Sequence, residues 1–347
     1  MYSAIASVRL PLSVFTVDTT GRKVLESRRY SPYRDNIYAR VKRPDSAGYW
    51  VSCGSIQEKC QPKDCDFVIL IIHGGGYVSG HPVILLPGYL RMSEIFSEHG
   101  LKVGLFAIEY TYAPTCAFPT QAHQAQASYE YLIRDCGIDP AKIVVMGESA
   151  GGHLAVSLMV LLAKTRQTVI GAPRLCLPPA CLILISPWVD MAQQPEPKSE
   201  NDTDFLNQRL LNEWSRLVFP DEDSETTRTY RNLSQGPPND LGFSWKQILP
   251  ETCWISAGGD ELFLPGIQSF VEHAQGAGVS VGFEVAPGEG HSWSAVEVMF
   301  KPGRLLSLPI ESDLEKGVKI LPGISLVASK IVERMATTTK TGAVSEV

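Results

Sequence analysis

Gly147-Glu148-Ser149-Ala150-Gly151 lies directly after the short apolar run Ile143–Met146 and directly before a helical pattern. A G-x-S-x-G sequence between a buried strand and a helix predicts a nucleophile elbow, a tight turn that raises the serine oxygen above the sheet. The turn is strained and neighbouring backbones pass close to it, so glycine is needed on both sides. Ser149 is therefore the predicted nucleophile, because of the elements that flank the motif as much as the motif itself.

A second glycine-rich turn, His73-Gly74-Gly75-Gly76-Tyr77, follows the apolar run Phe67–Ile72. Successive glycines let backbone N–H groups point into one concavity. Together with the N–H of Ala150, they suit the oxyanion of a tetrahedral acyl-transfer intermediate. A phosphate-binding loop is the alternative, but the turn has neither the G-x-G-x-x-G spacing nor a terminal Gly-Lys-Ser/Thr. The sequence therefore predicts an oxyanion hole that precedes the nucleophile in the chain.

A serine nucleophile at an elbow is followed in the chain first by its acid and then by its base. His291 is the predicted base, because it lies in a glycine loop, Pro287-Gly288-Glu289-Gly290-His291, just past a predicted strand. His273 falls within a helical pattern and is expected at the surface. His153 lies one helical turn beyond the nucleophile and is expected to be a packing residue.

Asp260 is the predicted acid that orients the imidazole. It follows the apolar run Thr252–Ser256 through Ala257-Gly258-Gly259, so its position and its order in the chain both fit. Glu261, one residue further on, is the close competitor and the second choice. Asp190 follows an earlier apolar run and is expected to be structural.

Short apolar runs that alternate with helical patterns predict an α/β fold, with a mostly parallel central sheet flanked by helices and carrying a helical cap. Each run is continuous, as expected for strands buried on both sides. The predicted strands are Phe67–Ile72, Val103–Ile108, Ile143–Met146, Cys181–Ile185, Thr252–Ser256 and Val281–Val285. The predicted helices are Gln121–Asp135, Gly151–Lys164, Gly266–Gln275 and Ile324–Met335.

The insertion between Ile185 and Thr252 is too long for a crossover helix and predicts a lid over a pocket. An amphipathic pattern within it carries Phe205, Leu206, Leu210, Trp214, Leu217 and Val218. Trp214 and Leu210, with Tyr77 from the glycine turn, are the predicted pocket residues. The predicted division is residues 1–50 as the N-terminal part of the cap, 51–186 and 246–340 as the core, 187–245 as the cap insertion and 341–347 as a disordered tail. Residues 301–322 have no predicted role.

Composition restricts the partners of the chain. Its 347 residues carry 31 Lys and Arg against 37 Asp and Glu, a net charge of −6 without a basic run, which argues against nucleic acid. No stretch is apolar over the roughly 20 residues that a membrane helix needs, so no stable membrane insertion is expected. Met1 to Val17 lacks the features of a secretory signal, and a cytoplasmic location is expected. The oligomeric state is unknown from the sequence.

The eight cysteines are expected to be free thiols in a reducing compartment, packed as small hydrophobic residues. They form no Cys-x-x-Cys pair, and Cys53, Cys60 and Cys65 have no nearby histidine that would complete a zinc site. Neither a metal nor an organic cofactor is therefore expected.

The two glycine motifs together resemble the signatures HGGG and G-D/E-S-A-G of the hormone-sensitive-lipase-like esterases, the microbial family IV group of the α/β-hydrolase superfamily. The likeness runs from about Phe67 to Trp293, and its further segments are Tyr110-Thr111-Tyr112-Ala113-Pro114, Phe118-Pro119, Asp139-Pro140-Ala141-Lys142-Ile143 and Ser186-Pro187-Trp188. It implies the α/β-hydrolase fold, with Gly75 and Gly76 as oxyanion donors beside Ala150. Thr111, Tyr112 and Thr115 stand where the family usually has Arg, Leu and Glu, which bears on the shape of the pocket.

The motifs and the resemblance imply a serine hydrolase that cleaves a small carboxylic ester through an acyl-enzyme on Ser149. Two alternatives share this architecture. One is an amidase of the kynurenine-formamidase type, and the other is an acyltransferase or thioester-releasing hydrolase of specialised metabolism. A pseudoenzyme that only binds protein is disfavoured because every catalytic element is present. The sequence does not indicate the acyl and alcohol groups of the substrate.

Overall fold

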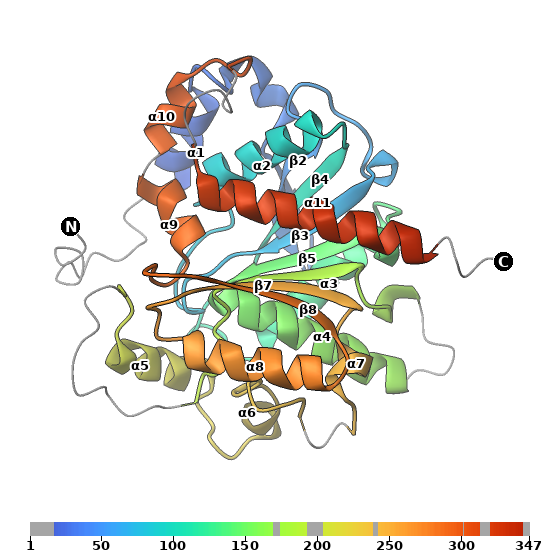
Figure 1. The fold of residues 1–347 in the computed structure, drawn as a ribbon, viewed down its shortest axis with the longest axis vertical. Coiled ribbons are helices and arrows are strands. Elements are labelled where there is room, and N and C mark those ends of the chain that lie inside the picture. The colour runs from blue at the N-terminus through green and yellow to red at the C-terminus, as the bar shows by residue number, and fades with distance from the viewer. Residues whose placement is uncertain are drawn as a thin grey trace.

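The computed structural model describes residues 17–168, 174–192, 204–238, 242–300, 302–312 and 320–342. Within them, the centre of the molecule is an eight-stranded sheet in the order β1-β2-β4-β3-β5-β6-β7-β8 (Figure 1). The strands are β1 (Ala39–Lys42), β2 (Ala47–Gly54), β3 (Phe67–Ile72), β4 (Val103–Glu109), β5 (Ile143–Glu148), β6 (Cys181–Ile185), β7 (Thr252–Gly258) and β8 (Ser280–Ala286). β2 pairs antiparallel with both of its neighbours, and β3 to β8 run parallel to one another.

Helices cover both faces of this sheet, which explains why its central strands are continuously apolar. In β3, Val68 and Leu70 pack into the core on one face, and Ile69 and Ile71 pack into the core on the other. The first face is covered by α3 (Thr120–Arg134), α4 (Ala150–Thr168), α7 (Trp245–Ile248) and α8 (Leu264–Gly276). The second is covered by α1 (Val17–Leu25), α2 (Leu86–Glu98), α9 (Trp293–Phe300), α10 (Pro302–Ser307) and α11 (Pro322–Gly342).

The six predicted strands and four predicted helices of the core are all present, whereas β1, β2, α2 and several shorter helices have no predicted counterpart. β1 is a four-residue edge strand with mostly exposed side chains, and β2 carries an irregularity between Trp50 and Ser52 that breaks its register with β4. α2 is buried on almost every side, including Arg91 and Glu94, so its sequence has no polar face. The Arg29 side chain lies 2.6 Å from Glu94, and this ion pair lets the helix bury its charges.

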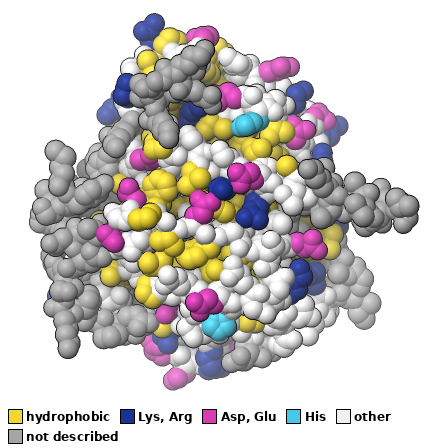
Figure 2. Space-filling view, in the orientation of Figure 1, with side chains coloured by type: hydrophobic (Ala, Val, Ile, Leu, Met, Phe, Trp, Pro, Cys, Tyr) yellow, Lys and Arg dark blue, Asp and Glu magenta, His cyan; other side chains and the backbone are white. Residues whose placement is uncertain are grey.

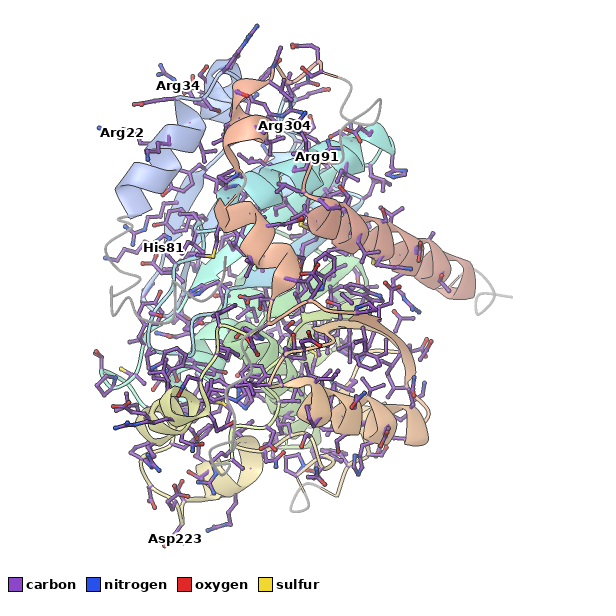
Figure 3. The ribbon with its side chains drawn as sticks, turned by 60° about the vertical axis from the view of Figure 1, so that its left-hand side comes forward. Arg22, Arg34, His81, Arg91, Asp223 and Arg304 are labelled. Atoms are coloured by element: carbon purple, nitrogen blue, oxygen red, sulfur yellow. The ribbon has the colours of Figure 1, made fainter. Side chains whose placement is uncertain are left out.

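The N-terminal segment does not form one lid with the insertion. β1 and the first half of β2 belong to the sheet, so the predicted boundary at residue 50 falls inside a strand. Val24 of α1 packs on the α2 side of the sheet, whereas the insertion packs on the other side. In Figures 1 and 3, α1 with Arg22 and the segment with Asp223 lie toward opposite ends of the molecule. Residues 1–16 lie outside the described part, and we restrict the proposed cap to the insertion.

The insertion contains α5 (Gln208–Val218) and α6 (Glu225–Tyr230), while residues 193–203 and 239–241 of it are not described. The segment without a predicted role, 301–322, contains α10, and the Pro309 carbonyl accepts a hydrogen bond from Arg29 at 2.7 Å. This segment therefore anchors the N-terminal region to α2. The chain is helical up to Gly342, and the rest of the predicted tail, 343–347, lies outside the described residues.

The surface fits a chain of small net charge. On the face shown in Figure 2, acidic and basic side chains are interspersed among hydrophobic and neutral ones. A nucleic-acid-binding face would gather Lys and Arg into a stripe or patch, and the coloured residues of this face do not. Among the described helices, none has the length and apolar character that crossing a membrane requires.

Candidate active site

Ser149 lies at the turn between β5 and α4 with a backbone φ of 55°, as the elbow requires. Its N–H donates to the Ile185 carbonyl at 2.9 Å, and its carbonyl accepts the N–H of Trp188 at 3.0 Å. The elbow is thereby fixed to the end of β6. A side chain at Gly151 would collide with the backbone of Ile72 at the end of β3, which explains the glycine after the nucleophile.

His291 lies against the nucleophile. The Ser149 hydroxyl and His291 Nε2 are 2.8 Å apart, and both side chains are buried. The Phe263 and Phe205 rings lie with their centroids 4.7 and 5.6 Å from the imidazole. With its proton on Nδ1, the imidazole accepts the serine hydroxyl proton, the geometry of a general base and its nucleophile. Of the other histidines considered, His153 is buried in the core and His273 is exposed, as predicted.

The carboxylate beside the imidazole belongs to Glu261, not to the first choice, Asp260. Glu261 Oε2 lies 3.8 Å from His291 Nδ1, and the side chain is only 4% exposed. Asp260 uses its backbone N–H to donate to the Glu289 carbonyl at 3.0 Å, and its side chain is half-buried. Neither Glu261 Oε1 nor His291 Nδ1 has a hydrogen-bond partner among the described residues. A small shift of the glutamate would pair two buried polar atoms that the resting structure leaves unpaired.

Two serines that the sequence analysis did not single out hold the acid and base in place. Ser186 Oγ donates to Glu261 Oε2 at 2.6 Å and accepts the N–H of Ser292 at 3.0 Å. Ser292 Oγ lies 3.2 Å from His291 Nε2 and donates to Glu148. Ser149, Ser186 and Ser292 all have positive φ, which is rare outside glycine. Strained backbone of this kind concentrates at functional sites, where surrounding hydrogen bonds maintain it.

The glycine turn abuts the nucleophile. A Cβ added at Gly74 would lie 3.0 Å from the Cβ of Ser149, so the backbone passes directly beside the reacting oxygen. Gly75 and Gly76 have φ of 111° and 64°, conformations that direct successive N–H groups to one side. Within the described residues, neither N–H donates to a protein acceptor. Both donors are thus open for a ligand oxygen.

Burial sets the protonation of His291 and Glu261. It lowers the pKa of His291 to about 3, so the imidazole is neutral at physiological pH and ready to accept a proton. Burial also raises the pKa of Glu261 to about 8; hydrogen bonds from Ser186 and Gly258 oppose this rise, and the carboxylates of Asp204 and Glu148 add to it. Ionisation of Glu261, rather than of His291, is therefore the step that titrates near neutral pH.

The raised pKa of Glu261 predicts a stability penalty at alkaline pH. The folded state keeps the Glu261 proton up to about pH 8, whereas the unfolded state loses it near the ordinary value of 4.5. The folded state therefore binds more protons in this window, and its stability falls as pH rises through it. Glutamine mimics the protonated acid at every pH. We expect Glu261→Gln to become more stable than the parent, by up to a few kcal/mol, as pH rises from about 5 to about 9.

Thermal unfolding of both proteins across this range measures the effect. Asp260→Asn is the matched control, because it changes the neighbouring carboxylate and leaves Glu261 in place, so the fall in Tm at alkaline pH that Glu261 causes should persist in it. A Tm difference for Glu261→Gln that does not grow with pH contradicts the buried-acid assignment.

Of the three predicted pocket residues, one is part of the core. Tyr77 is fully buried, and its hydroxyl donates to His153 Nδ1 at 2.7 Å, while His153 Nε2 donates to the Tyr230 carbonyl at 2.8 Å. Tyr77 thus supports the glycine turn from beneath. Trp214 on α5 covers Gly76, because a side chain added at Gly76 would collide with the Trp214 indole ring. Leu210, one helical turn earlier, is 39% exposed.

Two stripes on α5 explain how the cap helix is held. Leu211, Ser215 and Val218 are buried, at the i, i+4, i+7 spacing of one helical face. Leu210, Trp214 and Leu217 form a neighbouring stripe that is half-buried or exposed. The first stripe anchors the helix to the core, so the second is left at the surface beside the oxyanion turn.

Asp204, which the sequence analysis missed, ties the cap to the triad loops. Its carboxylate accepts the backbone N–H of Leu262 at 2.7 Å and of Leu206 at 3.1 Å. Burial raises the pKa of Asp204, and backbone N–H groups, among them that of His291, oppose the rise. No sequence pattern marks its link to the loop after β7, because Leu262 is brought close to Asp204 only by the fold.

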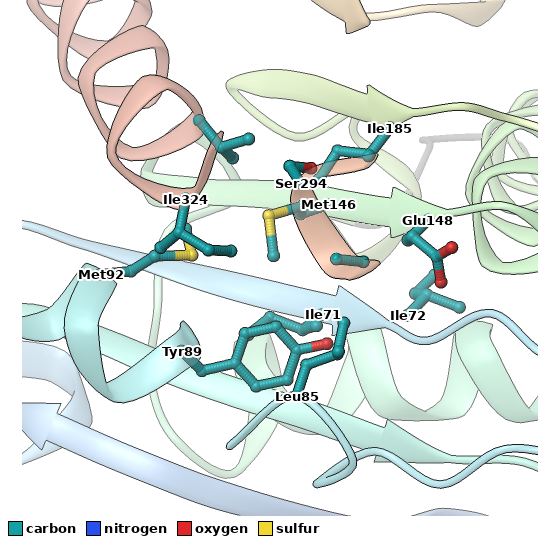
Figure 4. Close-up of a pocket in the computed structure, with 12 residues that line it drawn as sticks. Ile71, Ile72, Leu85, Tyr89, Met92, Met146, Glu148, Ile185, Ser294 and Ile324 are labelled. Atoms are coloured by element: carbon teal, nitrogen blue, oxygen red, sulfur yellow. The ribbon is translucent and has the colours of Figure 1, made fainter. Parts of the chain in front are cut away.

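The cavity in Figure 4 is not an acyl pocket. It measures about 20 Å³, has room for roughly one water molecule, and lies on the α2 and α11 side of the sheet. Ile71, Met146 and Ile324 line it, with the polar groups of Tyr89 and Glu148 at its wall. An ester substrate does not fit there.

Comparisons with known proteins agree with this geometry. A family model described as alpha/beta hydrolase fold matches residues 69–295. The chain is 25% identical over 236 residues to an acetyl-hydrolase of Streptomyces hygroscopicus, covering 68% of this chain and 71% of the relative. It is 26% identical to an ethyl acetate hydrolase of Pseudomonas putida, covering 65% of each chain. The fold matches the crystal structure of a hormone-sensitive lipase from a metagenome library with a TM-score of 0.65 and 23% identity, over 96% of both chains.

The family match covers both glycine motifs, the acid turn and the histidine loop, so it includes every element of the site just described. These two relatives are named as an acetyl-hydrolase and an ethyl acetate hydrolase, which does not favour the acyltransferase and amidase alternatives. The chain belongs to the family of the alpha/beta hydrolase fold and is a serine esterase whose motifs resemble those of the hormone-sensitive-lipase-like group.

Proposed function

We propose that Ser149, His291 and Glu261 form the catalytic triad and that the N–H groups of Gly75, Gly76 and Ala150 form the oxyanion hole. The observation that carries the proposal is the 2.8 Å contact between Ser149 Oγ and His291 Nε2 beside the open N–H groups of the glycine turn. The acid is revised from Asp260 to Glu261 on the 3.8 Å separation from His291 Nδ1. The substrate we propose is a carboxylic ester with a short acyl group.

Acylation follows from this arrangement. Ser149 Oγ attacks the ester carbonyl carbon while its proton passes to His291 Nε2. The imidazolium that forms is stabilised by ionised Glu261, and the carbonyl oxygen, now negatively charged, accepts hydrogen bonds from the three N–H groups. When the intermediate collapses, the C–O bond to the alcohol breaks and Nε2 returns the proton to the leaving oxygen. The product is an acyl ester of Ser149.

Deacylation repeats these steps with water. His291 Nε2 takes a proton from the water molecule as its oxygen attacks the acyl carbon, and the oxyanion is held as before. Collapse breaks the bond to Ser149 Oγ, which recovers its proton from Nε2, and the carboxylic acid leaves. The neutral imidazole that burial maintains is the form that both half-reactions require.

The cap limits the acyl group. Trp214 lies over Gly76, so its indole ring is next to the position of the acyl carbonyl. The relatives named for acetyl groups and ethyl acetate point to the same class of small acyl group. We infer that Trp214 and Leu210 form the wall at which the acyl chain ends.

Truncating the side chains of this wall should shift the acyl chain length that the enzyme hydrolyses best. Each methylene that becomes buried contributes about 0.8 kcal/mol, or roughly fourfold in kcat/KM. Trp214→Ala should therefore raise kcat/KM for medium-length acyl groups by about that factor for each added methylene, with little change for acetate. Leu210→Ala should act in the same direction with a smaller effect. Hydrolysis of p-nitrophenyl esters of graded chain length measures the profile.

The matched control is Leu177→Ala, which removes an exposed leucine outside the insertion and should leave the profile unchanged. If Trp214→Ala and Leu210→Ala both keep the parent's chain-length profile, α5 serves only to pack on the core and the lid assignment is wrong.

The cytoplasmic location stays a prediction of the sequence.

A further inference from the structure

Three cysteines of the segment 53–65 meet in space, away from the proposed catalytic site. Cys53 lies near the end of β2, Cys60 in the loop that follows, and Cys65 just before β3 begins. The Cys53 and Cys65 sulfurs are 3.7 Å apart, and those of Cys60 and Cys65 are 3.6 Å apart. All three sulfurs lie within 4.8 Å of one another, and two of the three residues are buried.

The loop that carries them is held by its own backbone. The Cys60 N–H donates to the Cys53 carbonyl at 3.0 Å, and the Cys65 N–H donates to the Pro62 carbonyl at 3.3 Å. Gly54, with φ of 93°, makes the turn possible, and a Cβ added there would lie 3.0 Å from the Cys60 sulfur. The three thiols are therefore brought together by a 13-residue segment, at a small cost in chain entropy.

The cluster lies at the edge of the sheet opposite the nucleophile. Gly54 and Phe67 both pair with Val103, the first residue of β4, whereas Ser149 follows the last residue of the parallel strand β5. Parallel strands start at one edge and end at the other, so the thiols and the triad are separated by the length of the strands. The catalytic mechanism makes no use of these thiols.

The separations between the sulfurs indicate which ion would fit. Four ligands at the Zn–S distance of about 2.3 Å around a tetrahedral ion place neighbouring sulfurs about 3.8 Å apart, whereas three in a plane at the same bond length place them about 4.0 Å apart. The Cys53–Cys65 and Cys60–Cys65 separations of 3.7 and 3.6 Å are closer to the tetrahedral edge, and the Cys53 and Cys60 sulfurs lie within 4.8 Å of each other. Soft thiolate ligands without oxygen donors select zinc over magnesium or calcium.

We propose that Cys53, Cys60 and Cys65 bind one Zn²⁺ ion, with the fourth tetrahedral position open on the half-exposed side of Cys60. The ion would join the end of β2 to the start of β3 and stabilise the sheet at that edge. Such a site needs no histidine, which is why the sequence pattern did not indicate it. Each thiol loses its proton when its sulfur binds the ion, so three protons leave for each Zn²⁺ bound.

The test uses the full chain, reduced and stripped of metal, with the thiols confirmed by alkylation and mass spectrometry. Co²⁺ is the probe, because tetrahedral cobalt thiolate absorbs visible light, and Zn²⁺ should displace it. We expect one Co²⁺ per chain, and a Tm that rises with Zn²⁺ concentration because the ion binds the folded state. Cys60→Ser should weaken binding at least about 100-fold and abolish the rise in Tm.

Cys136→Ser is the control, since it removes a half-buried thiol outside the cluster and should bind Co²⁺ as the parent does. Cys65→Ser provides a second loss-of-ligand variant, in case Cys60→Ser misfolds. The proposal fails if the reduced parent gives no tetrahedral cobalt band, or if the band survives in both Cys60→Ser and Cys65→Ser; the thiols are then packing residues. None of these readouts involves ester hydrolysis, so the outcome is independent of the proposed triad.

Discussion

Replacing Ser149 by alanine should lower kcat for ester hydrolysis by about 10⁶-fold, because no covalent intermediate can form without its hydroxyl. The change removes one oxygen atom that is hydrogen-bonded to His291 Nε2 and leaves the elbow backbone unchanged. Alanine adopts the required φ of 55° no more easily than serine, so a small loss of stability is the only structural cost expected. Burst kinetics with a p-nitrophenyl ester should show no acyl-enzyme.

Ser157→Ala is the matched control for this variant. Ser157 is a buried serine on the same helix, α4, and its hydroxyl has no hydrogen-bond partner among the described residues, so its removal should leave kcat and Tm close to the parent values. A folded Ser149→Ala protein that keeps a tenth of the parent activity would show that another group is the nucleophile.

The candidate nucleophile and base could be chosen from the sequence because the patterns that mark them are local. A nucleophile elbow is indicated by a motif of five consecutive residues between a strand and a helix, and His291 lies in a glycine loop after a strand. The parallel strands were predicted for a similar reason, since burial on both faces leaves an unbroken apolar run such as Phe67–Ile72. In each case the residue types that the structure requires are neighbours in the chain.

Features that depend on distant partners could not be predicted in this way. Asp204 accepts a hydrogen bond from the backbone N–H of Leu262, 58 positions away, and α2 buries charges that are neutralised by Arg29 of another segment. The cysteine cluster joins one residue of β2 to two positions in the connection to β3, through a turn at Gly54, and the three cysteines follow no recognisable spacing. The choice between Asp260 and Glu261 is of this kind, because the direction of two neighbouring side chains is set by the turn that carries them.

That turn favours the glutamate for a structural reason. The N–H of Asp260 is held by the Glu289 carbonyl, and the next residue then points back under the strand ends, where Gly258 N–H donates to Glu261 Oε2 at 2.9 Å. Ser186 donates to the same oxygen, so the carboxylate is fixed beside His291 Nδ1. Such hydrogen bonds from fixed donors are what an acid needs in order to hold the imidazole in one tautomer.

Glu261→Gln should therefore lower kcat by about 10⁴-fold, because an amide can donate to Nδ1, impose the wrong tautomer and leave the imidazolium without a counter-charge. Asp260→Asn, one residue away, should cost far less. The pH dependence separates an effect on catalysis from an effect on folding. The kcat/KM of the parent should rise with pH up to about 8, as Glu261 ionises. This rise should persist in Asp260→Asn but vanish in the residual activity of Glu261→Gln. Since Glu261→Gln is also expected to be the more stable protein at alkaline pH, a loss of rate there cannot come from unfolding. If purified Asp260→Asn instead shows the larger loss of kcat and no rise of kcat/KM with pH, then Asp260 orients His291, and Glu261 is a buried acid that only supports the turn.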